Sequence, residues 1–162
     1  RFEDGLAVEH WDNLQSKPAS LNLSKHSMID GSTEVEDVEK TEENRELIRS
    51  FVDEVLVNSQ LNRLEHFVDP EGYIEHNPLM ADSLSALHEA LASNDRLKSY
   101  DRIHRILAEG NFVLCVSEGF LDSIHSSFYD LFRLADGKIV EHWDTIEAVP
   151  NRSKWVNQNG KF

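Results

Sequence analysis

The sequence predicts an α+β domain in which helices cover one face of a strongly curved antiparallel sheet. Between residues 41 and 92, apolar residues recur at helical spacing, whereas from residue 100 to residue 148 they alternate with polar ones. Tight-turn signals separate the alternating runs, so consecutive strands should be antiparallel neighbours. Helices followed by such a meander are typical of α+β domains. A curved sheet closed at one end by helices forms a cone, which leaves an interior pocket.

Three helices are predicted, at residues 41–57, 60–68 and 83–92. In the first helix, Leu47, Phe51 and Val55 share one face, and Thr41 is the expected N-cap residue. Residues 73–78 form a short extended segment between the second and third helices. Each apolar helix face needs a sheet face to cover, which places all three helices against the sheet.

Four strands are predicted, at residues 100–108, 112–120, 126–134 and 138–148. Residues 109–111 and 135–137 contain glycine beside Asn or Asp, which favours tight hairpins. The core should combine apolar residues of helices and strands, namely Leu47, Phe51, Val55, Leu64, Leu87, Val113 and Phe132.

Composition excludes several classes of protein. The 162 residues suit one domain with a short appendage, and no apolar run approaches the ~20 residues that span a bilayer. Lys and Arg number 16 against 30 Asp and Glu, a net charge of −14, which disfavours binding to nucleic acid or to an anionic membrane. Cys115 is the single cysteine, so the sequence predicts no disulfide framework and favours a reducing, cytoplasmic compartment.

An internal repeat links the first residues to the predicted last hairpin. Residues 1–15 read RFEDGLAVEHWDNLQ and residues 133–147 read RLADGKIVEHWDTIE, with 8 of 15 positions identical. The simplest interpretation is that residues 1–15 are the terminal strand of a preceding copy of the domain. Two unrelated strands that share an Asp-Gly turn are the alternative.

The chain therefore divides into three predicted parts. Residues 1–15 are the strand remnant, residues 16–37 are a polar linker, and residues 38–162 are the main domain. An isolated strand with exposed apolar residues invites association. We expect it to add to a sheet edge or to exchange with a second chain in a homodimer.

Four segments resemble the SnoaL-like group of the nuclear transport factor 2-like (NTF2-like) superfamily. They are MIDGSTEVEDVEKTEENRELIRSFVDEVL from residue 28, YIEHNP from residue 73, HRILAEGNFVLCVSEG from residue 104 and DLFRLADGKIVEHWD from residue 130. The resemblance implies a cone-shaped α+β barrel, often dimerised through the sheet, that works without a cofactor. It also implies an activity of the aldol-condensation or polyketide-cyclase type, with Asp144 at the position of an acid/base Asp on a late strand.

His142 and Asp144 are the leading catalytic candidates. Alternation along the last strand places Val140, His142, Asp144 and Ile146 on one face, and Ile139, Glu141, Trp143 and Thr145 on the other. An imidazole and a carboxylate in an apolar pocket can move a proton next to a carbonyl group. A purely structural hydrogen-bonding role for Asp144 is equally open.

The remaining candidates are less constrained by the pattern. The bend at Pro78 can aim His76, as oxyanion donor, or Asn77 into the pocket mouth, although both can instead cap a turn. His104 lies either in the pocket or on the surface. The other residues expected to line the ligand pocket are Tyr73, Trp143 and Phe128.

A metal site is not predicted, because no His-x-x-x-His or Glu-x-x-His spacing is present. Two functions follow from these residues. One is a cofactor-free acid/base enzyme acting on a small carbonyl compound as a cyclase, isomerase or aldol-condensation catalyst. The other is a non-catalytic domain that binds a small molecule and dimerises.

Overall fold

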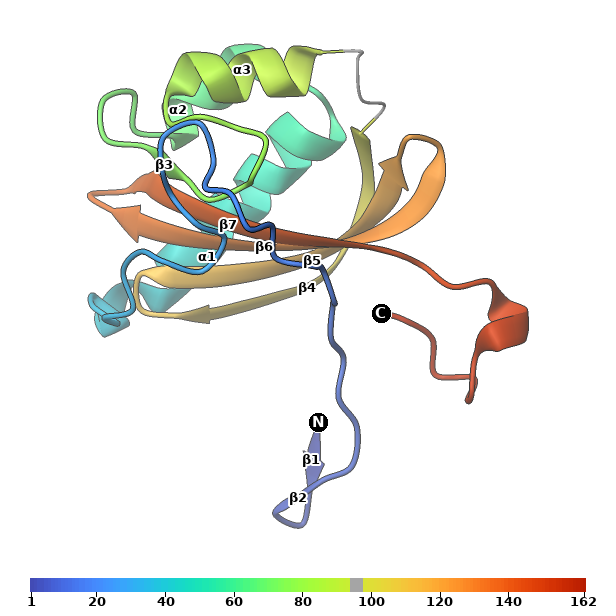
Figure 1. Cartoon of the computed structure of the whole chain (residues 1–162). Helices are drawn as coiled ribbons and strands as arrows, with labels where there is room; N and C mark the ends of the chain where they lie inside the picture. The colour runs from blue at the N-terminus through green and yellow to red at the C-terminus, as the bar shows by residue number, and fades with distance from the viewer. Residues whose placement is uncertain (94–97) are drawn as a thin grey trace.

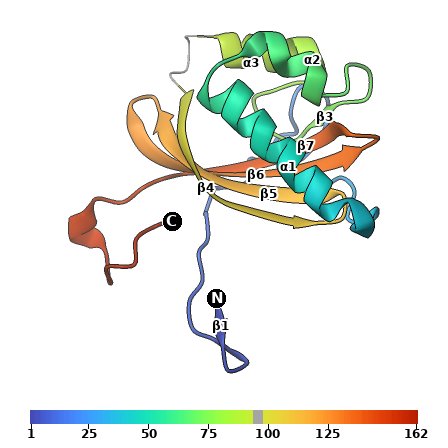
Figure 2. The ribbon, with the colours of Figure 1, turned by 180° about the vertical axis from the view of Figure 1, so that it is seen from behind.

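A five-stranded sheet with helices on one face forms the body of the molecule in the computed structural model, which describes residues 1–93 and 98–162 (Figures 1 and 2). In chain order the strands of this sheet are β3 (Ile74–Glu75), β4 (Lys98–Glu109), β5 (Phe112–Leu121), β6 (Ile124–Ala135) and β7 (Lys138–Ala148). They lie side by side in the order β3-β7-β6-β5-β4, and the four long strands form an antiparallel meander. The predicted α+β fold with a curved sheet is confirmed.

The short strand β3 departs from the prediction of an entirely antiparallel sheet. It pairs with β7 in parallel, with Ile74 opposite Glu141 and Glu75 opposite His142. A hairpin turn sets the direction of consecutive strands only, and the whole meander separates β3 from β7. This pairing brings the segment 73–78 to the centre of the last strand.

Because β7 contains a bulge, the predicted division of its side chains between the two faces is partly wrong. Arg133 pairs with Glu141 and Leu134 pairs with Ile139, so Val140 is an extra residue in the strand. Ile139 therefore joins the core on the same face as His142, whereas strict alternation placed it on the opposite face. Beyond the bulge the alternation holds, and His142 and Asp144 face the interior together.

Bulges also change the faces of β4. The register shifts between Tyr100 and Arg102 and again between Ile103 and Arg105, which leaves His104 as an extra residue. Tyr100 is buried, and Ile103 packs on the core. Strict alternation would put His104 on the face of Tyr100, but the first irregularity places Ile103 on that face instead.

The three predicted helical regions are all present. The first is α1 (Thr41–Phe51), which continues as a π-helix over Val52–Val57. The others are α2 (Leu64–Phe67), preceded by a 3-10 helix over Leu61–Arg63, and α3 (Leu84–Ala92). Among the described residues, no helix has the length and apolar character needed to cross a lipid bilayer.

Thr41 is not an N-cap. A 3-10 helix over Val38–Lys40 precedes α1, so Thr41 is already helical, and its hydroxyl donates to the Val38 carbonyl at 2.7 Å. The same oxygen accepts the Gly110 amide at 2.8 Å, which fastens the start of α1 to the β4–β5 turn. The helix α3 does have a side-chain N-cap, because Ser83 Oγ accepts the Ala86 amide at 3.1 Å.

The core lies between α1 and the concave face of the sheet, where Phe51 meets Phe132 edge to face at 5.6 Å. Six of the seven predicted core residues are buried and the seventh, Leu47, is half-buried and packs against them. Burial of these side chains supplies the main free energy that holds the helices on the sheet.

The segment before α1 lies on the other face of the sheet (Figure 1). Residues 16–37, expected to act as a linker, are tied to that face: Asn22 Nδ2 donates to the Glu75 carbonyl at 2.6 Å, and Trp143 Nε1 donates to the Asp30 carbonyl at 2.8 Å. The first residues form a small hairpin of β1 (Phe2–Glu3) and β2 (Leu6–Ala7), which pair with each other and not with the five-stranded sheet.

Candidate active site

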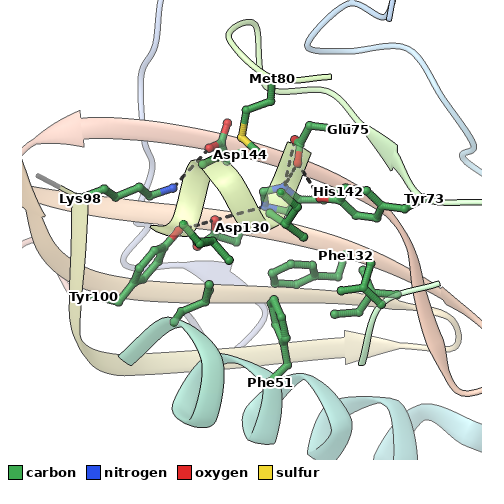
Figure 3. A pocket seen from close by; sticks show the side chains of 16 residues that line it. Phe51, Tyr73, Glu75, Met80, Lys98, Tyr100, Asp130, Phe132, His142 and Asp144 are labelled. Atoms are coloured by element: carbon green, nitrogen blue, oxygen red, sulfur yellow. Dashed lines mark hydrogen bonds and ion pairs between the residues drawn. The ribbon is translucent and has the colours of Figure 1, made fainter. Parts of the chain in front are cut away.

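A cavity of about 60 Å³ lies between the helices and the concave face of the sheet (Figure 3). One end is polar, lined by Tyr73, Glu75, Lys98, Tyr100, Asp130, His142 and Asp144. The remaining wall is apolar, contributed by Phe51, Leu56, Val68, Met80, Leu87, Ala90, Leu91, Phe132 and Ile139. A mostly apolar cavity with convergent ionisable groups at one end has the kind of lining that small-molecule sites have.

The register of β3, β6 and β7 assembles the polar end. Asp130 lies opposite Asp144, and Phe132 lies opposite His142, on neighbouring strands. Glu75 lies opposite His142 on the other side. Residues two apart on a strand share a face, so these pairs all point into the same cavity.

His142 is held between two carboxylates. Its Nδ1 lies 3.0 and 3.1 Å from the two oxygens of Glu75, and its Nε2 lies 3.2 Å from Asp130 Oδ1. Burial alone would lower the pKa of this imidazole, but the two negative neighbours outweigh burial and raise it to about 10. His142 is therefore an imidazolium at neutral pH, with the ring of Phe132 stacked on it at 4.8 Å.

Glu75 is fully buried and is surrounded by donors. The Tyr73 hydroxyl donates to Oε2 at 2.5 Å, and the Asn77 amide donates to Oε1 at 2.9 Å. Burial raises the pKa of the Glu75 carboxyl, but the charge and hydrogen bond of His142 outweigh burial and bring the pKa below its usual value. Glu75 and His142 thus form a buried ion pair.

Asp130 has a free acceptor at the cavity. The Tyr100 hydroxyl donates to its Oδ1 at 3.0 Å, the atom that also faces His142. Its Oδ2 is buried and has no hydrogen-bond partner within residues 1–93 and 98–162. A buried carboxylate oxygen without a donor is costly, so this atom is suited to accept a hydrogen bond from a bound molecule.

Asp144 differs from the other two carboxylates. Burial raises the pKa of Asp144, and the positive charges of Lys98 and His142 offset this only in part. Asn77 Nδ2 lies 2.9 and 2.8 Å from the two carboxylate oxygens, and Lys98 Nζ lies 3.8 Å from Oδ2. Asp144 is consequently an oriented carboxyl group that binds a proton more readily than an exposed Asp.

A larger chamber of about 530 Å³ adjoins the cavity. Met80, Ala90 and Lys98 line both spaces, so Lys98 stands at the boundary between them. Asn77, which binds Asp144, also lines the outer chamber. A molecule in this chamber is therefore within reach of the groups around Asp144.

Comparisons with known proteins identify the fold. No protein-family model and no curated protein matches the sequence. An NTF2-like protein of unknown function from Burkholderia xenovorans superposes with a TM-score of 0.60 at 15% identity, over 75% of this chain and 99% of that chain. A candidate ketosteroid isomerase from Kribbella flavida gives a TM-score of 0.58 at 16% identity, over 74% and 91%. This chain has the NTF2-like fold.

A SnoaL-like polyketide cyclase from Agrobacterium tumefaciens also matches, with a TM-score of 0.52 at 12% identity, over 64% of this chain and 91% of that chain. The predicted resemblance to NTF2-like proteins is thus confirmed at the level of the fold. Because one fold can support many activities, function has to be argued from the site.

The NTF2-like cavity contains three of the eight predicted site residues: Tyr73, His142 and Asp144. Asn77 contacts Asp144 from the outer chamber. Phe128 is buried behind Tyr100, with ring centroids 4.6 Å apart, and does not line the cavity itself.

The other three predicted residues lie elsewhere. His76 and Trp143 stack on each other at 4.6 Å on the outer face of the sheet, so His76 does not reach the cavity as the predicted oxyanion donor. Both residues precede or follow a cavity residue by one position, and alternation turns them outward. His104 binds Glu118 at 3.0 Å and stacks on Phe162 at 4.1 Å.

Glu75, Lys98, Tyr100 and Asp130 are site residues that sequence reasoning did not select. Asp130 could have been selected from the sequence, because it places a charge between Phe128 and Phe132 on the inward face of one strand. Glu75 needed the parallel pairing with β7, which no local pattern indicates.

Proposed function

We propose that this protein is a cofactor-independent acid/base catalyst that moves a proton next to the carbonyl group of a small, largely apolar compound. The observation that carries the proposal is Asp144, a buried carboxyl with a raised pKa at the edge of an apolar cavity. A general acid/base works best when its pKa lies near the working pH, and burial moves an Asp in that direction.

Asp144 is the group that takes and returns the proton. Asn77 binds both of its oxygens, which fixes the carboxyl plane while leaving the pKa raised by burial. Removal of a proton from the carbon next to a carbonyl converts Asp144 to its acid form, and the same proton can then return to another atom. Isomerisation, cyclisation and aldol condensation all begin with this step.

Positive charge near Asp144 stabilises the enolate that forms. Lys98 Nζ lies 3.8 Å from Asp144 Oδ2 at the boundary of the two chambers, and His142 adds a buried imidazolium. Preformed charges in a poorly solvated site stabilise a developing oxyanion strongly. Lys98 therefore takes the role that the sequence assigned to His76.

The two spaces indicate how a substrate is held. The inner cavity of about 60 Å³ admits only a small group, whereas the outer chamber of about 530 Å³ holds a larger body. We assign the reactive carbonyl end to the inner cavity and the remainder to the outer chamber. A hydroxyl group on the substrate would find its acceptor at Asp130 Oδ2.

Deuterium exchange tests this proposal without knowledge of the natural substrate. A panel of small ketones and β-dicarbonyl compounds is incubated with the protein in D2O, and deuterium entry at the α carbon is followed by NMR. We expect catalysed exchange with a subset of the panel, and a loss of about 100-fold or more in Asp144→Asn.

The repeat supplies a matched control. Asp12 corresponds to Asp144 in the internal repeat, but it is exposed on the N-terminal segment. Asp12→Asn should leave exchange unchanged. Ligand binding in the cavity without any catalysed exchange would overturn the enzyme proposal and favour the non-catalytic binding function.

A further inference from the structure

A second polar cluster lies on the outer face of the sheet, on the side opposite the catalytic cavity. In the part of the chain that the structure describes, His26, Asp30 and His76 bring one ligand atom each to within 4.8 Å of one another. His26 and Asp30 come from the segment before α1, and His76 follows β3. The proposed catalytic reaction uses none of these residues.

The oxygen atoms around His76 form an environment that suits a cation. Its Nε2 lies 2.8 Å from Glu141 Oε1, while its Nδ1 lies 2.8 Å from the Ser27 carbonyl and 2.9 Å from Asp30 Oδ1. All three partners are hydrogen-bond acceptors. When Nε2 donates its proton to Glu141, the Nδ1 lone pair faces two oxygens, and a positive charge between them satisfies all three atoms.

Each of the two histidines has a carboxylate beside one ring nitrogen. A metal-binding histidine typically has its second nitrogen held by a carboxylate, which fixes the ring and its tautomer. Glu141 holds Nε2 of His76 and is itself held by Arg133 Nε at 2.6 Å. Asp82 Oδ2 lies 3.1 Å from Nε2 of His26.

The cluster is also rigid and reachable. Trp143 stacks on His76 with an interplanar angle of 6°, and its indole donates to the Asp30 carbonyl at 2.8 Å. The side chains of His26 and Asp30 are 31% and 48% exposed, so an ion can enter from solvent. Asp30 is further fixed by the Ser27 amide, which donates to its Oδ2 at 3.0 Å.

We propose that His26, Asp30 and His76 form a binding site for a divalent transition-metal ion such as Zn²⁺. Two imidazole nitrogens and one carboxylate oxygen suit Zn²⁺ and its neighbours in the first transition row, whereas Ca²⁺ and Mg²⁺ prefer oxygen ligands. Three protein ligands leave a position for water. The sequence did not predict this site, because its ligands are separated along the chain and meet only when the segment before α1 packs on the sheet.

Bound metal would fasten residues 26–30 to the sheet. Asp82 connects the cluster to the catalytic cavity, since its Oδ1 accepts the Glu75 amide at 3.0 Å while its Oδ2 faces His26. The ion would thus brace the strand that positions Glu75. This role is separate from proton transfer at Asp144, so either proposal can fail without the other.

Calorimetric titration of untagged, chelator-treated protein with ZnCl2 tests the site. We expect one ion per chain, with affinity lost in His26→Ala and Asp30→Asn and reduced about 10- to 100-fold in the supporting variant Asp82→Asn. His88→Ala, an exposed histidine on α3, is the matched control and should bind like the wild type. Circular dichroism of each variant verifies the fold.

Co²⁺ provides a readout of the coordination itself. We expect visible absorption bands typical of low-coordinate Co²⁺ with the wild type and with the control His88→Ala, and no such bands with His26→Ala. Absence of Zn²⁺ binding by the wild type, or equal binding by folded His26→Ala, would overturn the proposal.

Discussion

The two faces of the β3–β7 pair carry the same two residue types with the strands exchanged. On the inner face Glu75 contacts His142, and on the outer face His76 contacts Glu141. All four side chains are nearly inaccessible to solvent. On the inner face, one imidazole lies between two carboxylates, Glu75 and Asp130. On the outer face, one carboxylate lies between an imidazole and the Arg133 guanidinium.

This difference separates two kinds of chemistry. The inner arrangement stabilises an imidazolium, so His142 contributes a fixed positive charge to the cavity and is not itself the proton carrier. On the outer face, the Arg133 guanidinium balances the negative charge of Glu141. The other nitrogen of His76 lies beside Asp30 and the Ser27 carbonyl. In the two proposals, the inner face supports proton transfer at Asp144 and the outer face supports cation binding at His76.

Removal of the inner imidazolium should have the largest effect on stability. His142→Leu leaves Glu75 and Asp130 buried without their common partner, so we expect a loss of about 3–5 kcal/mol in the free energy of unfolding. Urea denaturation at pH 7 measures it. Glu141→Gln is the comparison on the outer face and should cost less, because Arg133 is 20% exposed and can reach water. Equal losses would contradict the distinction between the faces.

Stability should also depend on pH through the inner pair. The folded-state pKa of His142 is raised from its usual 6.5 to about 10, so its contribution is complete below pH 6.5 and is lost as pH rises from about 6.5 through about 10. We expect the free energy of unfolding to fall across this window in urea titrations of the wild type. The fall should be much smaller in His142→Gln. An identical fall in both proteins would assign it to other groups.

The sequence predicted the fold well because its signals are local. Helical spacing around Phe51, the Asp-Gly turn at residues 135–137 and alternation through Phe132 each act within one element or hairpin. The site was predicted less completely, because its placement depends on bulges and on pairing between distant strands. Alternation left the face of His104 open because bulges decide it, and His76 lies outside the cavity because β3 alternates with Glu75 inward.

A substitution at Gly31 tests the close packing over the outer cluster. Gly31 has φ of +108°, and a Cβ there would lie 2.3 Å from Glu141 Oε1 and 2.6 Å from Trp143 Cζ2. We expect Gly31→Ala to cost about 1–3 kcal/mol and to increase amide hydrogen exchange in residues 26–31. Gly5→Ala is the control, since nothing lies within 4 Å of a Cβ at that residue, although its φ is also positive. Equal losses of stability in the two variants would show that the cost comes from backbone strain and not from contacts of the added Cβ.

The N-terminal hairpin should contribute least to the stability of one chain. Phe2 and Leu6 are 73% and 69% exposed, whereas Asn13 donates to the Ser127 and Thr145 carbonyls at 3.0 Å. If residues 1–15 mediate the expected homodimer, deletion of residues 1–12 should convert dimer to monomer in light scattering. The unfolding free energy should change by less than about 1 kcal/mol. An unchanged mass after this deletion, and also in the double variant Phe2→Ser/Leu6→Ser, would contradict this role.

The protonation of Asp144 is the most direct test of the proposed catalysis. Carboxyl ¹³C NMR of aspartate-labelled protein, with the Asp144 signal assigned by its loss in Asp144→Asn, follows this group through a pH titration. We expect the Asp144 pKa to lie above its usual value of 3.8, because burial outweighs the charges of Lys98 and His142. A pKa at or below that value would show an ordinary ionised carboxylate and contradict its role as the proton carrier.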